Sequence, residues 1–542
     1  MKKKQLLKFI WMFFYLFIFS MLLWNSFGYL DNDLGWHLKV GEEFVTKHEI
    51  PYNEHFNYTL EGEKWIDHEW LIDVFSFIVF KNFGYITLSI FFALLIVLVL
   101  ALQKHYLQKY FLKNVTGEYF LMFFQFLGIK ASLPHLGVRM QEITILCLFL
   151  LFFILHKFVL NKNYKILLWL IPLFCFWANV HGGFLIGLAL LGFFAMIKFL
   201  ENLIEKYNVI SKIKMEFKNK LDLKSIYIFS FFALFSFLAT FINPYGWRLY
   251  EFLFGYKNSY YLTHIVEWIP FYFLPVKYYQ LLYSAIVLSL VIVFLYLSLK
   301  KIEKKYFLKL DLWQLALAVL FVFLALKSRR HFPLLFIASM PFIIIFYIEH
   351  IAAHYQNNKK PTQLILFSKI FLVLVLVLAS FKMVVNTQFN NNPFNSAFYC
   401  SNSFPCEAVK FIKENPELMQ KKLFNEYDWG GFLIWTMPEM KLFIDGRLPQ
   451  FSFNEHTFLE EYHEFFEEDK TSFKLEQYGI DLALIKERQP IKLNWIEKHF
   501  FLLNEEDINS KVDYLKKYLD ESSLWTIIYS DNFSHLYEKQ NN

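Results

Sequence analysis

Apolar stretches of about 20 residues recur along the first two thirds of the chain, and they constrain its fold more than any other feature. A helix needs about 20 residues to cross the roughly 30 Å hydrocarbon core of a membrane. We therefore predict a mostly α fold, a polytopic transmembrane helical bundle. Its eleven expected spans, of which the third and fifth are short, lie near residues 8–29, 85–102, 118–130, 142–160, 166–180, 184–200, 226–243, 280–299, 310–327, 332–350 and 364–385.

The composition agrees with that class. Of 542 residues, 56% are hydrophobic and only 19% are charged. A soluble globular protein has nearer a quarter of charged residues. With so large an apolar share and only four cysteines, a disordered chain and a disulfide scaffold are excluded.

Charge divides the chain into two domains. Residues 388–542 contain 16 Lys and Arg against 26 Asp and Glu, whereas residues 1–387 contain 38 against 22. We predict a transmembrane domain over 1–387, with its first outer loop at 30–84, and a C-terminal α/β domain over 388–542. The positive charge lies in short loops, so it indicates membrane topology and no nucleic-acid partner.

The distribution of Lys and Arg also orients the chain. They concentrate on one side of the predicted spans, most clearly from Lys206 to Lys224 and from Lys300 to Lys305. Because cytoplasmic loops are the positive ones, this predicts a cytoplasmic N-terminus and an extracytoplasmic tail. The opening run of lysines before the first apolar stretch has no small-residue cleavage site after it, so we expect an anchor rather than a signal peptide.

The tail alternates short apolar runs with helical patterns, which is typical of a small α/β domain. Cys400 and Cys406 would lie in an oxidising compartment, where they either form a small-loop disulfide or stay as two thiols. Cys147 and Cys175 fall in spans as packing residues. The expected strands are Leu423–Asn425, Phe432–Trp435, Leu442–Ile444, Leu482–Ile485 and Trp525–Tyr529, and the expected helices are 405–415, 455–468 and 510–520.

Unusual polar residues gather in the loops assigned to the outer face. Ionisable groups at membrane depth are costly, so several that converge from separate spans suggest one site. They are Asp31, Asp33, His37, the Trp65–Trp70 segment with His68 and Glu69, Arg139, His181, Glu267 and the Arg329–Arg330 pair.

Each group also has a structural interpretation. Asp31 and Asp33 would simply end the first span in water, the arginines would be snorkelling anchors, and His181 would cap a tight turn before Gly182. Outer-face arginines oppose the positive-inside trend, which favours anion binding. A metal held by His37 or His68 with acidic neighbours matches no standard zinc spacing.

This set of residues suits phosphate chemistry. Arginine presents a planar fork of donors to a phosphate ester. A nearby carboxylate can accept a proton from an attacking hydroxyl. Together they describe displacement of a lipid phosphate from a sugar's anomeric carbon through an oxocarbenium-like transition state.

With Asp31-Asn32-Asp33 directly after the first span, the chain resembles the polytopic GT-C glycosyltransferases, integral membrane enzymes with polyprenyl-phosphate-linked sugar donors. The resemblance covers roughly residues 1–387. It implies that the first outer loop holds the catalytic carboxylate. The segments WHLKVGEEFVTKHEIP, NVHGGF and NPYG resemble a largely uncharacterised bacterial subgroup, which implies the bacterial inner membrane as the location.

The resemblance assigns roles residue by residue. Asp31 or Asp33 would be the general base, and Arg139, Arg329 and Arg330 would hold the lipid phosphate with help from His181. Relatives differ in their need for a divalent metal such as Mg or Mn, which Asp31, Asp33 and His37 would bind. His37, His68, Glu69, Trp429, Asp445 and Arg447 form the expected acceptor region.

The expected function is transfer of a sugar from a polyprenyl-phosphate donor to an envelope glycan, lipid or protein acceptor. The Trp429–Trp435 segment departs from the acceptor motif of oligosaccharyltransferases, which argues against transfer to protein asparagine. Two alternatives remain open. An O-antigen polymerase or ligase also uses outer arginines but usually has its large outer loop later, and a transporter or flippase would carry charges mid-span at a repeat interface.

Overall fold

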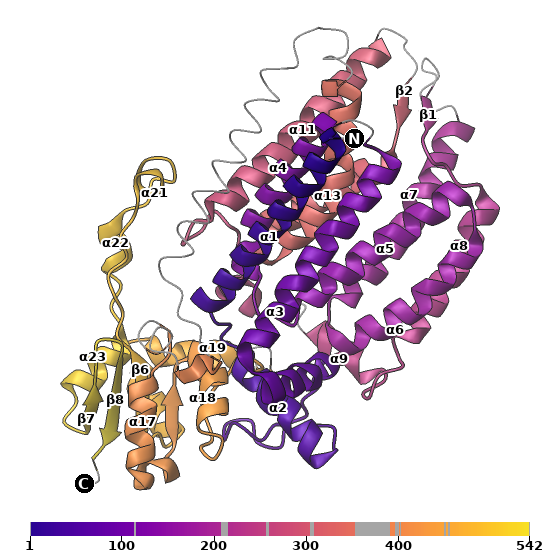
Figure 1. Cartoon of the computed structure of the whole chain (residues 1–542). Coiled ribbons are helices and arrows are strands. Elements are labelled where there is room, and N and C mark those ends of the chain that lie inside the picture. Colours follow the sequence, from indigo (N-terminus) through magenta and orange to yellow (C-terminus); the bar gives the residue numbers. More distant parts are fainter. Residues whose placement is uncertain are drawn as a thin grey trace. The chain divides into compact units, whose positions relative to one another are not determined.

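The computed structural model describes residues 2–112, 115–207, 215–255, 260–303, 308–352, 391–395, 400, 403–448, 451–453 and 456–540 (Figure 1). These residues form two compact units, each assembled from three stretches of sequence. Unit 1 holds the described parts of Met1–Gly28, Ser89–Trp247 and Val266–Gln388, and unit 2 those of Tyr29–Leu88, Arg248–Ile265 and Phe389–Asn542. The tail therefore forms one unit with the first loop and with a segment from the middle of the chain.

Unit 1 is a bundle of helices, as the apolar stretches predicted. Polar residues mark where helices begin: the Asp222 carboxylate caps one by accepting from the Ser225 N–H, and Asp311 caps another by accepting from the Gln314 N–H. The helices are α1 (Lys2–Gly28), the later part of α3 (Trp70–Tyr110), α4 (Val115–Ser132), α5 (Glu142–Asn161), α6 (Leu170–Val180), α7 (Phe184–Lys206), α8 (Leu223–Ala239), α11 (Tyr278–Glu303), α12 (Leu312–Lys327) and α13 (Phe332–Phe346).

Six of the described helices are long and apolar enough to cross a membrane, which makes this a multi-pass membrane protein. These segments are Gln5–Gly28, Trp70–Tyr110, Glu142–Asn161, Phe184–Lys206, Tyr278–Lys300 and Arg329–Ala352, and three shorter apolar ones are Tyr164–Val180, Leu223–Ala239 and Leu312–Lys327. The predicted third span corresponds to α4, which is not among the six. The predicted span at 364–385 lies outside the described residues.

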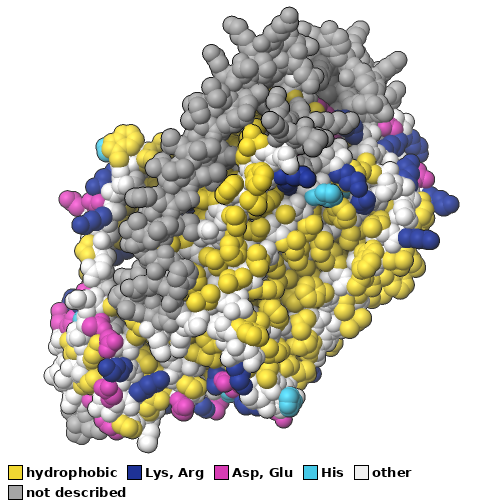
Figure 2. Space-filling model, in the orientation of Figure 1, with side chains coloured by type: hydrophobic (Ala, Val, Ile, Leu, Met, Phe, Trp, Pro, Cys, Tyr) yellow, Lys and Arg dark blue, Asp and Glu magenta, His cyan; other side chains and the backbone are white. Residues whose placement is uncertain are grey.

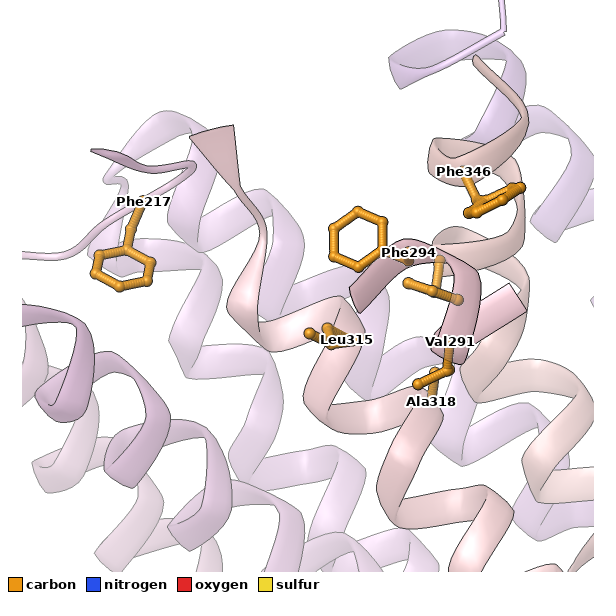
Figure 3. Close-up of a cluster of buried hydrophobic side chains, with 7 residues drawn as sticks. Phe217, Val291, Phe294, Leu315, Ala318 and Phe346 are labelled. Carbon is orange, nitrogen blue, oxygen red and sulfur yellow. The ribbon is translucent and has the colours of Figure 1, made fainter. Parts of the chain in front are cut away.

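The core of unit 1 is aromatic and aliphatic. One buried cluster joins α11, α12 and α13 to the short strand β1 (Met215–Phe217), which pairs in parallel with β2 (Leu308–Leu310) (Figure 3). Figure 2 shows hydrophobic side chains over the exposed face of the bundle, and Lys and Arg gathered at the end that carries β1 and β2. A bundle that is apolar inside and outside is what a lipid-facing protein requires.

Unit 2 contains a four-stranded sheet with strand order β3-β6-β8-β7. β3 and β6 pair in parallel, whereas β8 is antiparallel to both β6 and β7. Strands β4 (Ser452–Phe453) and β5 (His456–Thr457) form a separate pair. The sheet strands are β3 (Leu423–Asn425), β6 (Leu482–Lys486), β7 (Trp525–Ser530) and β8 (Ser534–Lys539).

Short helices accompany this sheet in unit 2, and α17 (Cys406–Glu414) and α23 (Tyr514–Glu521) pack against β7. The helix predicted at 405–415 is α17, and a capping box of Thr457 and Glu460 starts the one predicted at 455–468. The helices of unit 2 are α2 (Leu34–Lys47), the first part of α3, α9 (Arg248–Gly255), α10 (Tyr261–His264), α17, α18 (Gly430–Thr436), α19 (Phe458–His463), α20 (Thr471–Gln477), α21 (Trp495–His499), α22 (Glu505–Asn509) and α23 (Tyr514–Glu521).

Two predicted strands of the tail are wrong. Phe432–Trp435 is part of helix α18, because a four-residue apolar run fits either a strand or a buried helical turn. Leu442–Ile444 forms no ladder, and only an isolated bridge joins Leu442 to Asn57 of the first loop. The strands predicted at Leu423–Asn425, Leu482–Ile485 and Trp525–Tyr529 are confirmed as β3, β6 and β7.

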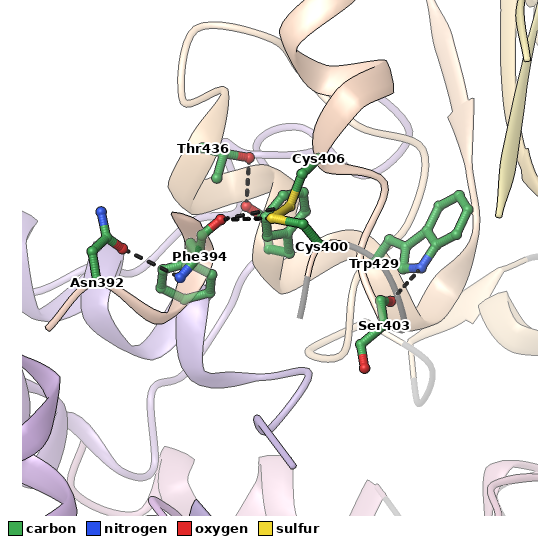
Figure 4. Close-up of a disulfide and its surroundings, with 8 residues drawn as sticks. Asn392, Phe394, Cys400, Ser403, Cys406, Trp429 and Thr436 are labelled. Atoms are coloured by element: carbon green, nitrogen blue, oxygen red, sulfur yellow. Dashed lines mark hydrogen bonds between the residues drawn. A yellow bond between two sulfur atoms is a disulfide. The ribbon is translucent and has the colours of Figure 1, made fainter. Parts of the chain in front are cut away.

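The disulfide interpretation of the tail cysteines is confirmed, since Cys400 and Cys406 are bonded with their Cα atoms 5.0 Å apart (Figure 4). Both sulfur atoms lie near the carbonyl of Phe394. Trp429, drawn beside them, donates from its indole N–H to the Ser403 carbonyl at 3.0 Å. The disulfide therefore lies at the start of α17, and the Trp429 hydrogen bond ties Ser403 to the residue that precedes α18.

Candidate functional site

The acidic turn Asp31-Asn32-Asp33 leads into helix α2. The backbone N–H of Asp33 donates to Oδ1 of Asp31 at 2.9 Å, and the N–H of Leu34 donates to the Asp31 carbonyl at 3.3 Å. Asp31 is therefore the residue that shapes the turn. Asp33 occupies the cap position of α2, and its carboxylate makes no cap hydrogen bond to the helix.

Glycines of the tail let this turn approach the C-terminal segment closely. A Cβ atom at Gly446 would lie 1.9 Å from Oδ1 of Asp33, and one at Gly431 would lie 2.3 Å from the carbonyl oxygen of Asn32. No real side chain tolerates these distances. The glycines of the two tail motifs are thus contact points for the acidic turn.

Arg447 of the tail is buried inside unit 2. Its guanidinium donates to both carboxylate oxygens of Asp445, at 2.9 and 2.7 Å, and to Glu54 of the first loop at 3.1 Å. The rings of Phe56 and Trp65 each lie 4.8 Å from its central carbon. Burial alone would lower the pKa of Arg447, but Asp445 and Glu54 outweigh burial and raise it. This arginine is a permanent cation that joins two distant segments.

A second buried cluster combines histidine with carboxylates. Nδ1 of His37 on α2 lies 2.8 Å from Oδ1 of Asp73 at the start of α3, and its Nε2 lies 3.5 Å from Glu69. His68 approaches the other oxygen of Glu69 at 3.5 Å. Asp67, fully buried, accepts from the Glu69 N–H at 3.0 Å. Burial raises the pKa of Asp67 well above its ordinary value, and Asp73 raises it further.

The arginine cluster of unit 1 is built around one carboxylate. NH1 of Arg139 lies 2.5 Å from Glu267, and NH1 of Arg330 lies 3.8 Å from it. The guanidinium of Arg330 also stacks 4.9 Å above the Trp268 ring. Burial would raise the pKa of Glu267, but Arg139 and Arg330 outweigh burial and lower that pKa to about 2. The three groups together carry one net positive charge.

Arg329 and His181 have different surroundings. Arg329 is buried and donates to the carbonyls of Pro270, Val266 and Phe273, at 3.2, 3.2 and 2.5 Å. These bonds hold the loop that carries Glu267. Nδ1 of His181 accepts from the Gly183 N–H at 2.8 Å and lies 2.9 Å from the Thr144 hydroxyl, which is the geometry of a capped turn.

The structure therefore sorts the sequence-predicted residues into two groups. Unit 2 brings together Asp31, Asp33, His37, His68, Glu69, Trp429, Asp445 and Arg447, and unit 1 brings Arg139 and Arg330 onto Glu267 while Arg329 and His181 stabilise loops. Trp429 and Asp445 are buried, and Asp445 forms an ion pair with Arg447.

Several residues of these clusters were absent from the predicted site. Glu54 and Asn57, the first-loop partners of Asp445 and Arg447, gave no local signal because the pairs lie nearly 400 residues apart. Asp73 could have been found, since it follows Glu69 by four residues and helical spacing puts both on one face.

Metal-ligating side chains converge at one of these clusters. One ligand atom each from His37, Glu69 and Asp73 lies within 4.8 Å of the others, and all three residues are buried. Among the described residues, the set expected from the sequence, Asp31 and Asp33 with His37, forms no such group. A second group, His456 with Glu461 and Glu464, is already paired with lysines, because Lys474 meets both glutamates and Lys470 meets Glu464.

No protein-family model and no curated protein matches this sequence. Among solved structures, the chain is similar to the oligosaccharyltransferase of Archaeoglobus fulgidus, crystallised with a disulfide-tethered acceptor peptide that contains the NVT sequon. The TM-score is 0.48 at 10% sequence identity, over 99% of this chain and 74% of that one. At this score and identity, the function has to be inferred from the residues themselves.

Proposed function

We propose that this protein is a membrane glycosyltransferase that moves a sugar from a polyprenyl-phosphate-linked donor to an envelope glycan, lipid or protein acceptor. The observation that carries the proposal is the arginine pair on Glu267. Two guanidinium groups share one carboxylate, and the side chains of Arg330 and Glu267 are 31% and 29% exposed. A cluster with excess positive charge and partial access in a multi-pass membrane protein suits a lipid phosphate.

The acidic turn Asp31-Asn32-Asp33 supports the proposed transfer of the sugar to an acceptor, because it supplies carboxylates that can act as the base. In transfer, an acceptor hydroxyl oxygen bonds to the anomeric carbon of the sugar while the bond from that carbon to the donor's phosphate oxygen breaks. The hydroxyl proton passes to a carboxylate, and the electron pair leaves with the phosphate. We assign the proton to Asp33 and the shaping of the turn to Asp31, whose Oδ1 accepts from the Asp33 N–H. Arg139 and Arg330 would stabilise the phosphate as it departs.

The proposal includes a location. The Lys and Arg of the loops support a cytoplasmic N-terminus and an extracytoplasmic unit 2, and the resemblance to a bacterial subgroup supports the bacterial inner membrane as the location. The disulfide between Cys400 and Cys406 supports an oxidising environment for the tail. The donor and acceptor would then meet the enzyme on the outer face.

A binding experiment tests whether Arg139 and Arg330 hold the lipid phosphate of the donor. Purified full-length protein in detergent is titrated with undecaprenyl phosphate, wild type against the Arg139→Ala/Arg330→Ala double variant. We expect the double variant to lose at least tenfold in affinity, or more than about 1.4 kcal/mol. Arg488→Ala, which removes an exposed arginine paired with Asp513, is the control for loss of an arginine elsewhere and should bind as wild type does. Equal binding by a folded double variant contradicts the proposal.

Two isosteric variants test the base. In Asp31→Asn the amide oxygen still accepts the Asp33 N–H, so the turn and most of the turnover should remain. Asp33→Asn should preserve folding and membrane insertion yet remove nearly all transfer, because an amide takes up no proton. Normal turnover in both variants would rule out the acidic turn as the source of the base.

A further inference from the structure

We propose that His37, Glu69 and Asp73 bind a divalent transition-metal ion, with Asp67 beside them. This inference is independent of the proposed transfer reaction, since it concerns a binding site that links two helices. Its ligands come from α2 and from the start of α3, both in unit 2. It is also a different place from the acidic turn, where the sequence had suggested a metal.

The positions of the ligands are fixed before any ion arrives. The imidazole of His37 stacks on the Trp36 ring with centroids 3.6 Å apart, and Trp36 itself packs edge-on against Trp65. Glu69 and Asp73 are one helical turn apart at the start of α3, where the Asp73 N–H donates to the Glu69 carbonyl at 3.1 Å. The three ligand atoms lie within 4.8 Å of one another, so small side-chain movements suffice to bring them onto one ion with bonds of about 2.0–2.2 Å.

The charge of the cluster calls for a cation. Three carboxylates, those of Asp67, Glu69 and Asp73, are buried together beside the imidazoles of His37 and His68. Oδ2 of Asp67 and Oδ2 of Asp73 are both buried and meet no N–H or O–H donor, and the Asp73 side chain lies within hydrogen-bonding reach of the Asp67 side chain. Isolated buried carboxylate oxygens are costly, and buried acids are normally paired or bound to metals. The charge of Arg447 also acts on Asp67, but its guanidinium is engaged by Asp445 and Glu54.

The donor set indicates the class of ion. Mg²⁺ and Ca²⁺ prefer shells made only of oxygen, whereas imidazole together with carboxylates suits Mn²⁺ or Zn²⁺. A shared proton between Asp67 and Asp73 is the competing explanation of the same geometry. A metal would also draw α2 to α3 and so stabilise the turn that precedes α2.

Binding of Mn²⁺ to the full-length protein tests the site directly. Chelator-treated protein in nanodiscs is titrated with Mn²⁺, and electron paramagnetic resonance measures the free ion. We expect one bound Mn²⁺ per chain and a spin-echo modulation from one directly coordinated histidine nitrogen. The second signal needs only the wild type, so it stands even where a variant fails to fold. No Mn²⁺ or Zn²⁺ bound at millimolar concentration would overturn the proposal.

Isosteric variants locate the ion. Glu69→Gln and Asp73→Asn keep side-chain volume while removing a ligand charge, and each should weaken Mn²⁺ binding at least tenfold. Saturating Mn²⁺ should raise the Tm of wild type and leave that of these variants unchanged. Asp33→Asn is the matched control, a carboxylate of the same unit outside the cluster, and should bind normally.

Two results would contradict the assignment. Loss of binding in Asp33→Asn equal to that in Glu69→Gln would move the metal to the acidic turn. Absence of metal from wild type together with a more stable Asp67→Asn variant would show that the two aspartates share a proton instead.

Discussion

The two units use arginine in opposite ways. In unit 2, Arg447 meets two carboxylates and two aromatic rings, and its side chain is 1% exposed. In unit 1, two arginines meet the single carboxylate of Glu267, and Arg330 and Glu267 remain partly exposed. Excess negative charge and complete burial make the first cluster architectural, whereas excess positive charge and access leave the second able to bind an anion.

Removal of the buried Arg447 should have the largest effect on stability. Arg447→Met should lower the free energy of unfolding by about 3–5 kcal/mol, because Asp445 and Glu54 would remain buried without a cation. Chemical unfolding in detergent measures the change. Arg488→Met, which breaks only an exposed pair with Asp513, is the control and should cost less than about 1 kcal/mol. Equal, small costs for both would mean that Arg447 is not structural.

The contact between Gly431 and Asn32 should have the next largest effect on stability. Gly431→Ala puts a methyl group where the Asn32 carbonyl now lies, so the acidic turn must shift, at a cost of about 1–3 kcal/mol. If Asp33 is the base, transfer should fall further than stability does. Gly255→Ala, also in unit 2 but with nothing within 4 Å of the added carbon, is the control. Wild-type activity in folded Gly431→Ala would show that the turn tolerates displacement.

Arg329 and Arg330 of unit 1 are neighbours in the sequence, yet their removal should affect different properties. Arg329→Ala should cost about 1–3 kcal/mol of stability, because three buried carbonyls lose their donor. Arg330→Ala should leave the Tm nearly unchanged and weaken undecaprenyl phosphate binding instead. Thermal unfolding and lipid titration of both variants separate the two effects. The reverse pattern would exchange the roles of the two residues.

Glu267→Gln should have the clearest pH signature of these variants. The pKa of Glu267 is lowered from 4.5 to about 2, so its ion pairs contribute fully above pH 4.5 and are lost as the pH falls towards 2. The difference in Tm between wild type and Glu267→Gln should therefore stay constant from pH 8 to 5 and shrink only below that. Removing the competing carboxylate should also raise affinity for the lipid phosphate. A difference that already changes near pH 6 would contradict this assignment.

What could be predicted from the sequence differs between the two units for a physical reason. A membrane helix such as α5 or α7 is one continuous apolar stretch, so its signal is local. The tail strands were partly predictable for the same reason, but α18 was not, because four apolar residues after two glycines fit either structure.

The contacts of the candidate site had no local signal. Asp33 lies against Gly446, and Arg447 pairs with Glu54, through contacts that only the folded chain creates. The residue types of both clusters could be named from the sequence, since ionisable residues stand out in the loops beside apolar spans. Their partners could not. That is why Glu267 was noted in its loop without being recognised as the centre of the arginine cluster.

The discontinuity of unit 2 also sets an order in time. About 300 residues separate Leu88 from Phe389, which at roughly 5–20 residues per second means roughly 15–60 s of synthesis between the two. Throughout that interval the Asp31–Asp33 turn lacks Gly431 and Gly446, and Glu54 lacks Arg447. The first loop therefore lacks its partner segment until the ribosome has synthesised the C-terminal part of unit 2. A nascent chain stalled in the membrane region would display that unfinished surface to the cell's proteases and chaperones.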